Sequence, residues 1–255
     1  MTSAGRVATC VGVLALVMAV APAVASAATC RGQPATIVRG GGDNTIEGTP
    51  GADVIVAGDG NDVVRAAGGD DMVCGGRGRD RLLGEVGLDV LVGESGNDVE
   101  RGGGGNDSMY GDASATGSGN AGGAGNDDEL SGGPGQDLIF GDSYSDSGDA
   151  RGGGDDVLEG GPDHDVLIGD SGTLTGSASG GGTDTLRGGD DGDILFGDSH
   201  AQGGGSESGG GRDLLRAGEG DDSLDGGPRR DRCDGDGGTD TADRCEVSTG
   251  IPKRA

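Results

Sequence analysis

The chain has no tryptophan, two phenylalanines, two tyrosines and one lysine among its 255 residues. So little aromatic bulk argues against the packed core of an ordinary enzyme domain. Seven prolines and no three-residue glycine period exclude collagen. A formal charge of −27 disfavours nucleic acid and membranes as partners and favours metal cations. Low hydrophobicity with high net charge is typical of disorder, unless the sequence contains regular order of its own.

Residues 1–27 differ in composition from the rest of the chain. Arg6 precedes an apolar run from Val11 to Val24, and Ala25-Ser26-Ala27 has the small side chains of a cleavage site. This pattern predicts a secretory signal peptide rather than a membrane span. Cleavage after Ala27 would remove Arg6, change the formal charge from −27 to −28 and leave residues 28–255, which we expect to be secreted.

Four cysteines would remain after cleavage: Cys30, Cys74, Cys233 and Cys245. An even number of cysteines in an exported chain predicts disulfides. Of the three possible pairings we favour Cys30–Cys74 with Cys233–Cys245, because each pair lies near one end of the chain. A zinc site is the alternative, which the lack of paired CxxC motifs and the presence of only two histidines disfavour.

A nine-residue period organises residues 39–243. Eight frames run without a gap from Arg39 to Tyr110, pairs of frames resume at positions 123, 151 and 179, and four more frames fill 208–243. The sixth position is Asp in seventeen of these eighteen frames and Asn44 in the first. The eighth position is apolar except at Glu100, and the fourth is Gly in fourteen frames. Such regularity predicts a repeat architecture rather than disorder.

Each conserved column of the repeat has a physical reason. Glycines at the first, second and fourth positions allow a tight turn with positive φ that aims carbonyl oxygens at one point. The aspartate at the sixth position adds a carboxylate oxygen, and together these are the ligands that suit Ca²⁺. The last three residues, such as Val54-Ile55-Val56, predict a short strand whose middle side chain points inward and builds a narrow core.

These nonapeptides resemble the RTX, or haemolysin-type, calcium-binding repeat family, whose signature is GGxGxDxUx. The resemblance covers residues 39–243 and implies an all-β fold, a right-handed parallel β-roll in which two nonapeptides form one turn and Ca²⁺ binds between glycine-rich turns. Asn44 is a weaker match than the aspartates, and Arg229 in place of a turn glycine weakens the site of Asp231. The metal carboxylates that the resemblance implies are Asp53, Asp62, Asp71, Asp80, Asp89, Asp98, Asp107, Asp128, Asp137, Asp156, Asp165, Asp184, Asp193, Asp213, Asp222, Asp231 and Asp240.

The two ends of the repeat region predict caps that cover open strand edges. Residues 28–38 keep the strand end of the motif but have Ala35 at the metal position, so we expect a half-turn without calcium. Residues 244–255 serve the same purpose at the other end. In strict register Cys30 and Cys74 would lie two turns apart, beyond disulfide reach, so this pairing requires the N-terminal segment to leave the register.

Four inserts interrupt the later frames, at 111–122, 141–150, 169–178 and 197–207. Each begins with Gly-Asp-Ser or Gly-Asp-Ala, and their starts are 30, 28 and 28 residues apart, so one insert leaves each turn along the same edge. Their Gly and Ser content predicts mobile loops. The arithmetic puts Asp112, Asp142, Asp170 and Asp198 at equivalent points of successive turns. Their mutual repulsion is relieved either by splayed, solvated loops or by extra weakly bound Ca²⁺.

The sequence therefore predicts a secreted, non-enzymatic protein that binds several Ca²⁺ ions and folds as it does so. The alternative is an extracellular adhesive or cell-surface structural protein that binds a partner through the insert-bearing edge. A hydrolase is disfavoured. Gly169-Asp170-Ser171-Gly172 matches the surroundings of a serine nucleophile, but the triplet recurs with the repeat, and His164 and His200 are the only available bases.

Overall fold

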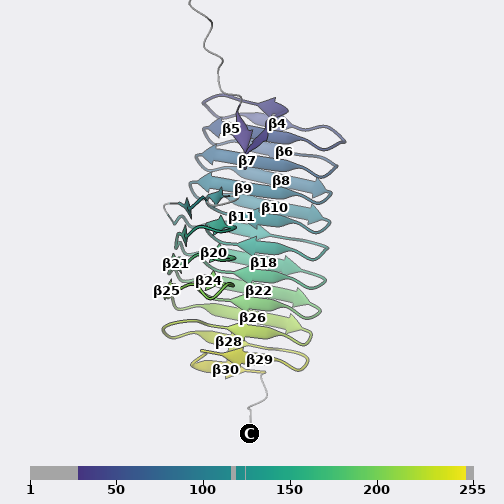
Figure 1. Ribbon diagram of the computed structural model, residues 1–255. Coiled ribbons are helices and arrows are strands. Elements are labelled where there is room, and N and C mark those ends of the chain that lie inside the picture. The colour runs from purple at the N-terminus through teal and green to yellow at the C-terminus, as the bar shows by residue number, and fades with distance from the viewer. Residues whose placement is uncertain (1–27, 116–118, 124, 251–255) are drawn as a thin grey trace, which may run out of the picture.

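The computed structural model describes residues 28–115, 119–123 and 125–250 and consists of strands and turns. The predicted signal peptide, including Cys10, lies outside these described residues. The roll has two parallel sheets, and in each of them ten strands stack along one axis. The chain passes from one sheet to the other with every frame (Figure 1). The predicted parallel β-roll is confirmed.

One strand of each turn belongs to the first large sheet, which follows the odd-numbered frames. Its members are β4 (Thr45–Glu47), β6 (Val63–Arg65), β8 (Arg81–Val86), β10 (Val99–Gly104), β14 (Glu129–Ser131), β18 (Val157–Gly161), β22 (Thr185–Asp190), β26 (Leu214–Glu219), β28 (Arg232–Asp234) and β30 (Val247–Thr249).

The other strand of each turn belongs to the second large sheet. Its members are β3 (Ile37–Val38), β5 (Val54–Asp59), β7 (Met72–Arg77), β9 (Val90–Ser95), β11 (Ser108–Tyr110), β15 (Leu138–Phe140), β19 (Val166–Ile168), β23 (Ile194–Phe196), β27 (Ser223–Asp225) and β29 (Thr241–Asp243). Val54 pairs with Met72 and Met72 with Val90, so one turn contains two nonapeptides, as predicted.

The core is built from the eighth position of the frames, with one file of buried, mostly aliphatic side chains on the inner face of each large sheet. Ile46, Leu82 and Leu130 are among these and are fully buried. Each side chain stabilises the roll by about 1.5–3 kcal/mol through burial, which is how a chain with few apolar residues maintains a core. Glu100 interrupts the file of the first large sheet. It lies in register between Leu82 and Leu130 and is itself fully buried.

The N-terminal segment leaves the register of the roll. β1 (Thr29–Cys30) and β2 (Gln33–Pro34) form an antiparallel hairpin, and only then does β3 join the second large sheet beside β5. Cys30 thereby reaches Cys74 on the outer face of β7, with the two Cα atoms 5.7 Å apart. Cys233 and Cys245 form the second disulfide, with a Cα–Cα distance of 6.0 Å. Both predicted pairings are confirmed.

The inserts all emerge along one edge, as predicted, but they are not loose loops. They form two further four-stranded parallel sheets that project from the roll (Figure 1). The inserts contain strands and not only loops because their near-equal lengths keep each insert beside the next, where their backbones pair. These strands are β12 (Ser114–Ala115), β16 (Tyr144–Ser145), β20 (Gly172–Thr173) and β24 (His200–Ala201), and β13 (Ala121–Gly122), β17 (Ala150–Arg151), β21 (Ala178–Gly180) and β25 (Glu207–Gly209).

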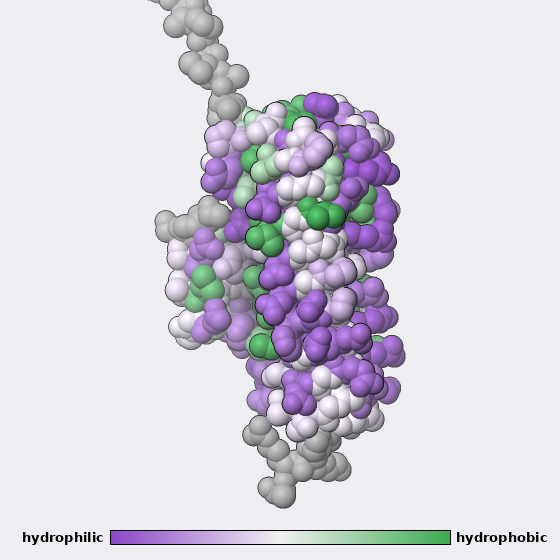
Figure 2. All heavy atoms as spheres, turned by 90° about the vertical axis from the view of Figure 1, so that its right-hand side faces the viewer, coloured by the Kyte–Doolittle hydropathy of each residue, from purple (hydrophilic) through white to green (hydrophobic). Residues whose placement is uncertain are grey.

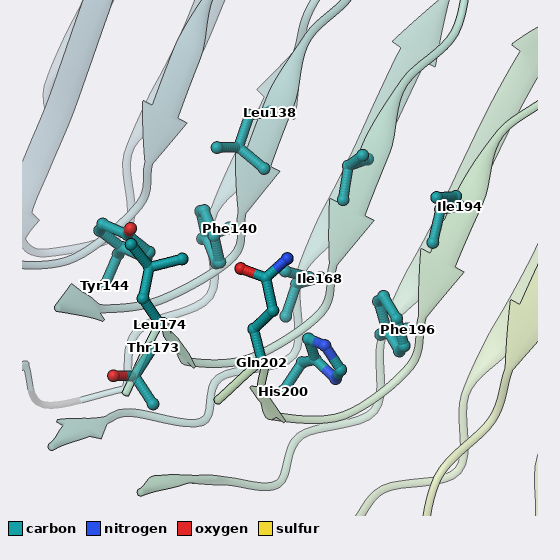
Figure 3. A pocket seen from close by; sticks show the side chains of 11 residues that line it. Leu138, Phe140, Tyr144, Ile168, Thr173, Leu174, Ile194, Phe196, His200 and Gln202 are labelled. Carbon is teal, nitrogen blue, oxygen red and sulfur yellow. The ribbon is translucent and has the colours of Figure 1, made fainter. Parts of the chain in front are cut away.

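The stacked inserts cover part of the outer face of the second large sheet. Phe140 and Ile168 point outward from this sheet and are buried against the inserts. Between the two layers lies a groove of about 290 Å³. Figure 3 shows Leu138, Ile194 and Phe196 on its roll side, opposite residues of the inserts. The opposite, insert-free edge is a largely hydrophilic surface (Figure 2).

Candidate metal centre

The sixth-position residues form two columns, one along each edge of the roll. Every aspartate in both columns is at most 6 % exposed. The insert-side column consists of Asn44, Asp62, Asp80, Asp98, Asp128, Asp156, Asp184, Asp213 and Asp231. The plain-side column consists of Asp53, Asp71, Asp89, Asp107, Asp137, Asp165, Asp193, Asp222 and Asp240.

Within each column, one carboxylate oxygen links its turn to the turn before. The backbone N–H of Asp62 donates to Asp80 Oδ1 at 2.8 Å, and that of Asp137 donates to Asp165 Oδ1 at 2.8 Å. The same bond recurs along both columns. It holds each carboxylate in one orientation and fixes where its second oxygen lies.

The second carboxylate oxygen has no partner. In sixteen of the seventeen aspartates Oδ2 is buried without a hydrogen bond. At Gly75, a first-position glycine, an added Cβ would lie 2.5 Å from Asp80 Oδ2 and 2.8 Å from the carbonyl oxygen of Gly93. Buried oxygens of two kinds therefore face the same small space. An unpaired buried carboxylate is costly unless a cation binds it, so the donor set fits a hard, oxygen-preferring ion such as Ca²⁺.

The first frame shows which backbone groups surround this space. The side-chain amide of Asn44 donates to the carbonyl oxygens of Gly40, at 3.2 Å, and of Gly42, and also to Asp62 Oδ1 at 2.9 Å. An amide N–H₂ group satisfies these oxygens by itself. An aspartate at the same position has no hydrogen to donate, so we expect the carbonyls of the second and fourth positions to need a cation there.

Asp53 differs from the other sixteen aspartates. Its Oδ2 accepts hydrogen bonds from the backbone N–H of Thr49 at 2.7 Å and from the Thr49 hydroxyl at 2.9 Å, and its Oδ1 accepts one from the Thr36 hydroxyl. Although burial acts to raise the pKa of Asp53, these hydrogen bonds lower it below the usual value. The protein itself therefore satisfies this carboxylate.

In the columns, burial is the main cause of raised pKa values, and carboxylates of neighbouring turns add to it. On the plain side the pKa of Asp137 rises to about 7 and that of Asp222 to about 6. On the insert side the pKa of Asp98 rises to about 8 and that of Asp213 to about 9. The insert-side column is therefore the harder one to ionise without a compensating cation.

Tight stacking explains the glycines of the second and fourth positions. Gly76 and Gly78 have φ of 113° and 140°, and a Cβ on either would clash with a carbonyl oxygen of the preceding turn. Arg229 adopts φ of 92° in the place of such a glycine. Beside it, Asp231 keeps both the hydrogen bond from the backbone N–H of Asp213 and a buried, unpartnered Oδ2, as in the other frames.

The ligand sets depend on the backbone. Among the described residues, no three His, Cys, Asp or Glu side chains lie close enough together to hold a metal by themselves. Each turn contributes one sixth-position carboxylate per edge, so the remaining ligands have to be carbonyl oxygens. Calcium accepts such mixed oxygen sets with six to eight ligands.

Comparison with known protein families agrees with this geometry. The RTX calcium-binding nonapeptide repeat matches at residues 39–73, 75–100, 87–115, 121–146, 152–173, 179–201 and 207–242. The chain belongs to this family. Repeats of the RTX family bind calcium, and each interval between the later RTX matches overlaps one of the inserts. Among curated proteins, no sequence is significantly similar to this RTX chain.

The nine-residue pattern does not predict one further member of the insert-side column. Glu246 continues the insert-side column beyond the last frame, since its Oε2 accepts the backbone N–H of Asp231 at 2.6 Å. β30 follows directly and pairs with β28. An acidic residue before a short β-prone segment could have indicated this position. The usual glycine turn is missing there, so the nine-residue pattern does not include Glu246.

Removing calcium should reverse the pH dependence of stability. The raised carboxyl pKa values mean that the folded, calcium-free chain binds more protons than the unfolded chain. Its stability is fully present below about pH 3.8, the unfolded value, and is lost as pH rises through about 6–9. Protein stripped of calcium on a chelating resin should therefore gain β-structure in circular dichroism between pH 7.5 and pH 4.5.

The calcium-saturated protein provides the control for this measurement. Protons compete with the metal for the same carboxylates, so acidification should lower the thermal midpoint of this form. If both forms respond to acid in the same direction, the columns are not the groups that control folding.

Proposed function

We propose that this protein is a secreted, non-enzymatic calcium-binding protein that folds as it binds several Ca²⁺ ions. The observation that carries the proposal is the pair of columns with sixteen buried aspartate oxygens that lack any partner. Successive carboxylates in a column lie one turn apart, about 4.8 Å by strand spacing, and repel one another. Bound Ca²⁺ supplies the positive charge that reverses this repulsion.

The chain's own residues make the binding cooperative. Each aspartate holds the backbone of the preceding turn through Oδ1 while its Oδ2 faces the cation space, as at Asp165. The backbone of one turn is therefore held in position only when the next turn is folded. Stability in such a solenoid is a sum of nearest-neighbour interfaces, so sites in the middle of the array depend on one another. Affinities of about 10⁻⁴–10⁻³ M are typical of extracellular calcium modules and match this use.

Secretion is supported by the leader pattern of residues 1–27 and by the two disulfides, which persist in oxidising compartments. A non-catalytic role is supported by the typical use of RTX repeats and by the position of the serine look-alike. Ser171 is fully buried, and its hydroxyl contacts the carbonyl oxygen of Gly152. His200 lies in the next insert, where it stacks on Phe196 and contacts Glu207. The described residues include no helix suited to crossing a membrane.

The test compares Asp165→Asn with Asp53→Asn. Both changes remove one charge and keep the shape of the side chain. Asp165 is mid-array with a free Oδ2, so its change should raise the Ca²⁺ midpoint for folding about tenfold, equivalent to ~1.4 kcal/mol. Asp53 is satisfied by Thr49 and Thr36, so its change should move the midpoint less than about twofold. Equal shifts in a calcium titration followed by circular dichroism would contradict the proposal.

A further inference from the structure

The four insert aspartates form a third column beside the insert-side column. β12, β16, β20 and β24 pair in register, with Ser114 opposite Tyr144, Tyr144 opposite Gly172, and Gly172 opposite His200. The aspartate two residues before each of these lies at the same point of successive turns. Asp112, Asp142 and Asp170 are 0 % exposed and Asp198 is 5 % exposed. Splayed, solvated loops are therefore excluded.

Each insert aspartate reaches toward the glycine turn of the frame that follows it. The backbone N–H of Gly125 donates to Asp112 Oδ2 at 3.1 Å, and that of Gly211 donates to Asp198 Oδ1 at 2.8 Å. An added Cβ at Gly123 would clash with Asp112 Oδ2. The inserts thus bring a second carboxylate per turn to a glycine cradle that already contains a sixth-position aspartate.

The described protein groups leave much of this column unsatisfied. Asp142 Oδ1, Asp198 Oδ2 and both carboxylate oxygens of Asp170 are buried without a hydrogen bond. The adjoining hydroxyls of Ser143 and Ser199 are also buried and unpartnered. These hydroxyls are uncharged, so their lack of a partner is an observation separate from the charge of the neighbouring aspartates.

A further buried acid lies near the N-terminal end of this column. Glu100 is fully buried in the core file of the first large sheet, and neither of its oxygens has a hydrogen-bond partner. Burial, and then the charges of Asp98 and Asp128, raise its pKa well above the usual value. The charge of Asp112 also contributes to the raised pKa of Asp98. Glu100 and the first insert therefore lie near the same part of the insert-side column.

We propose that the inserts create an additional row of divalent-cation sites, one for each of Asp112, Asp142, Asp170 and Asp198. The ligands would be the insert carboxylate, the free Oδ2 of the aspartate in the following frame, and oxygens of the adjoining turn. Hard oxygen ligands without nitrogen or sulfur select Ca²⁺. The inference rests on the proposed function, because the insert stack is assembled on a roll that itself folds with calcium.

Proton retention is the competing way to neutralise this column. Burial, followed by neighbouring carboxylates, raises the pKa of Asp142 to about 9 and that of Asp170 to about 10. Protonated carboxyls would need no metal, and the two possibilities differ in the number of ions bound at neutral pH.

The test is a count of bound calcium by equilibrium dialysis at pH 7.5 over a range of free Ca²⁺. The variant is Asp112→Asn, Asp142→Asn, Asp170→Asn and Asp198→Asn together. The matched control removes four exposed carboxylates at strand positions outside the glycine turns: Glu47→Gln, Glu129→Gln, Glu159→Gln and Asp243→Asn. We expect the insert variant to bind about four fewer ions per chain than the control, one per insert.

An unchanged count in the insert variant would assign the column to protons and overturn the inference while leaving the proposed function intact. Wild-type protein that bound no calcium would instead overturn the proposed function. If the fourfold variant lacks the β signal at saturating Ca²⁺, Asp170→Asn alone takes its place. It should fold and bind one ion fewer, because both oxygens of Asp170 are unpartnered, and an equal count would again overturn the inference.

Discussion

Removal of calcium at neutral pH should abolish most of the β-structure of the mature chain, and Ca²⁺ should restore it while Mg²⁺ should not. The physical reason is that sixteen aspartate oxygens are buried without a partner. Neighbouring carboxylates one turn apart, at ~4.8 Å, repel by about 0.9 kcal/mol even in water and more when buried. Mg²⁺ prefers a small octahedral shell and keeps its waters, so it does not suit a carbonyl-rich cradle.

Two measurements check this result. Far-UV circular dichroism should report the loss and recovery of strand signal. Small-angle scattering should show the radius of gyration rising toward the roughly 50 Å expected for an unfolded chain of this length. Both disulfides are kept oxidised throughout, so that calcium is the only variable. Retention of the full strand signal in chelator at pH 7.5 would show that the roll stands without metal, and coupled folding would be refuted.

The second large effect is expected from a single methyl group at the end of β10. Gly103 and Gly105 have φ of 117° and 138°, and a Cβ on either would clash with the carbonyl oxygen of Glu85 or Gly87 in the turn before. Changing either to Ala combines backbone strain with a clash against a backbone that cannot move alone. We expect a loss of about 3 kcal/mol or more in the calcium-bound form.

Gly104, the last residue of β10, lies between them and is the control. An added Cβ there has only the Glu85 carbonyl oxygen within reach, at 4.0 Å, and Gly104 does not adopt a positive φ. Gly104→Ala should therefore change stability by less than about 0.5 kcal/mol. Denaturant unfolding at saturating Ca²⁺ compares the three variants. Three equal losses would mean that glycine is needed here for general chain flexibility rather than for close stacking.

The repeating part of the fold was predictable from the sequence because it is periodic. A strict nine-residue pattern determines which side chain points inward, which turn needs glycine and which position presents a carboxylate, and repetition makes each local preference hold along the whole array. Near-equal insert spacing likewise predicted that all four inserts leave along one edge. Ile55 in the core and Asp71 in its column follow from this pattern alone.

The exceptions depended on contacts between residues that the period does not relate. Asp53 has the right residue type, yet it is satisfied by Thr49, four residues earlier in the same frame, and by Thr36 of the preceding turn, and neither threonine belongs to the nine-residue pattern. Glu246 joins the column without the motif, because the backbone of Asp231 is already in place to bind it.

The ends and inserts were likewise decided by tertiary structure. Cys30 reaches Cys74 because a hairpin leaves the stacking direction, which no repeat rule describes. Each insert considered alone has the sequence of a loop, since it contributes only two or three residues to each strand. Stacked on a roll that holds them at strand spacing, they pair with one another and bury Asp142 and Asp170. Periodicity therefore determined the roll and its two columns, and long-range packing decided which carboxylates remain without a partner.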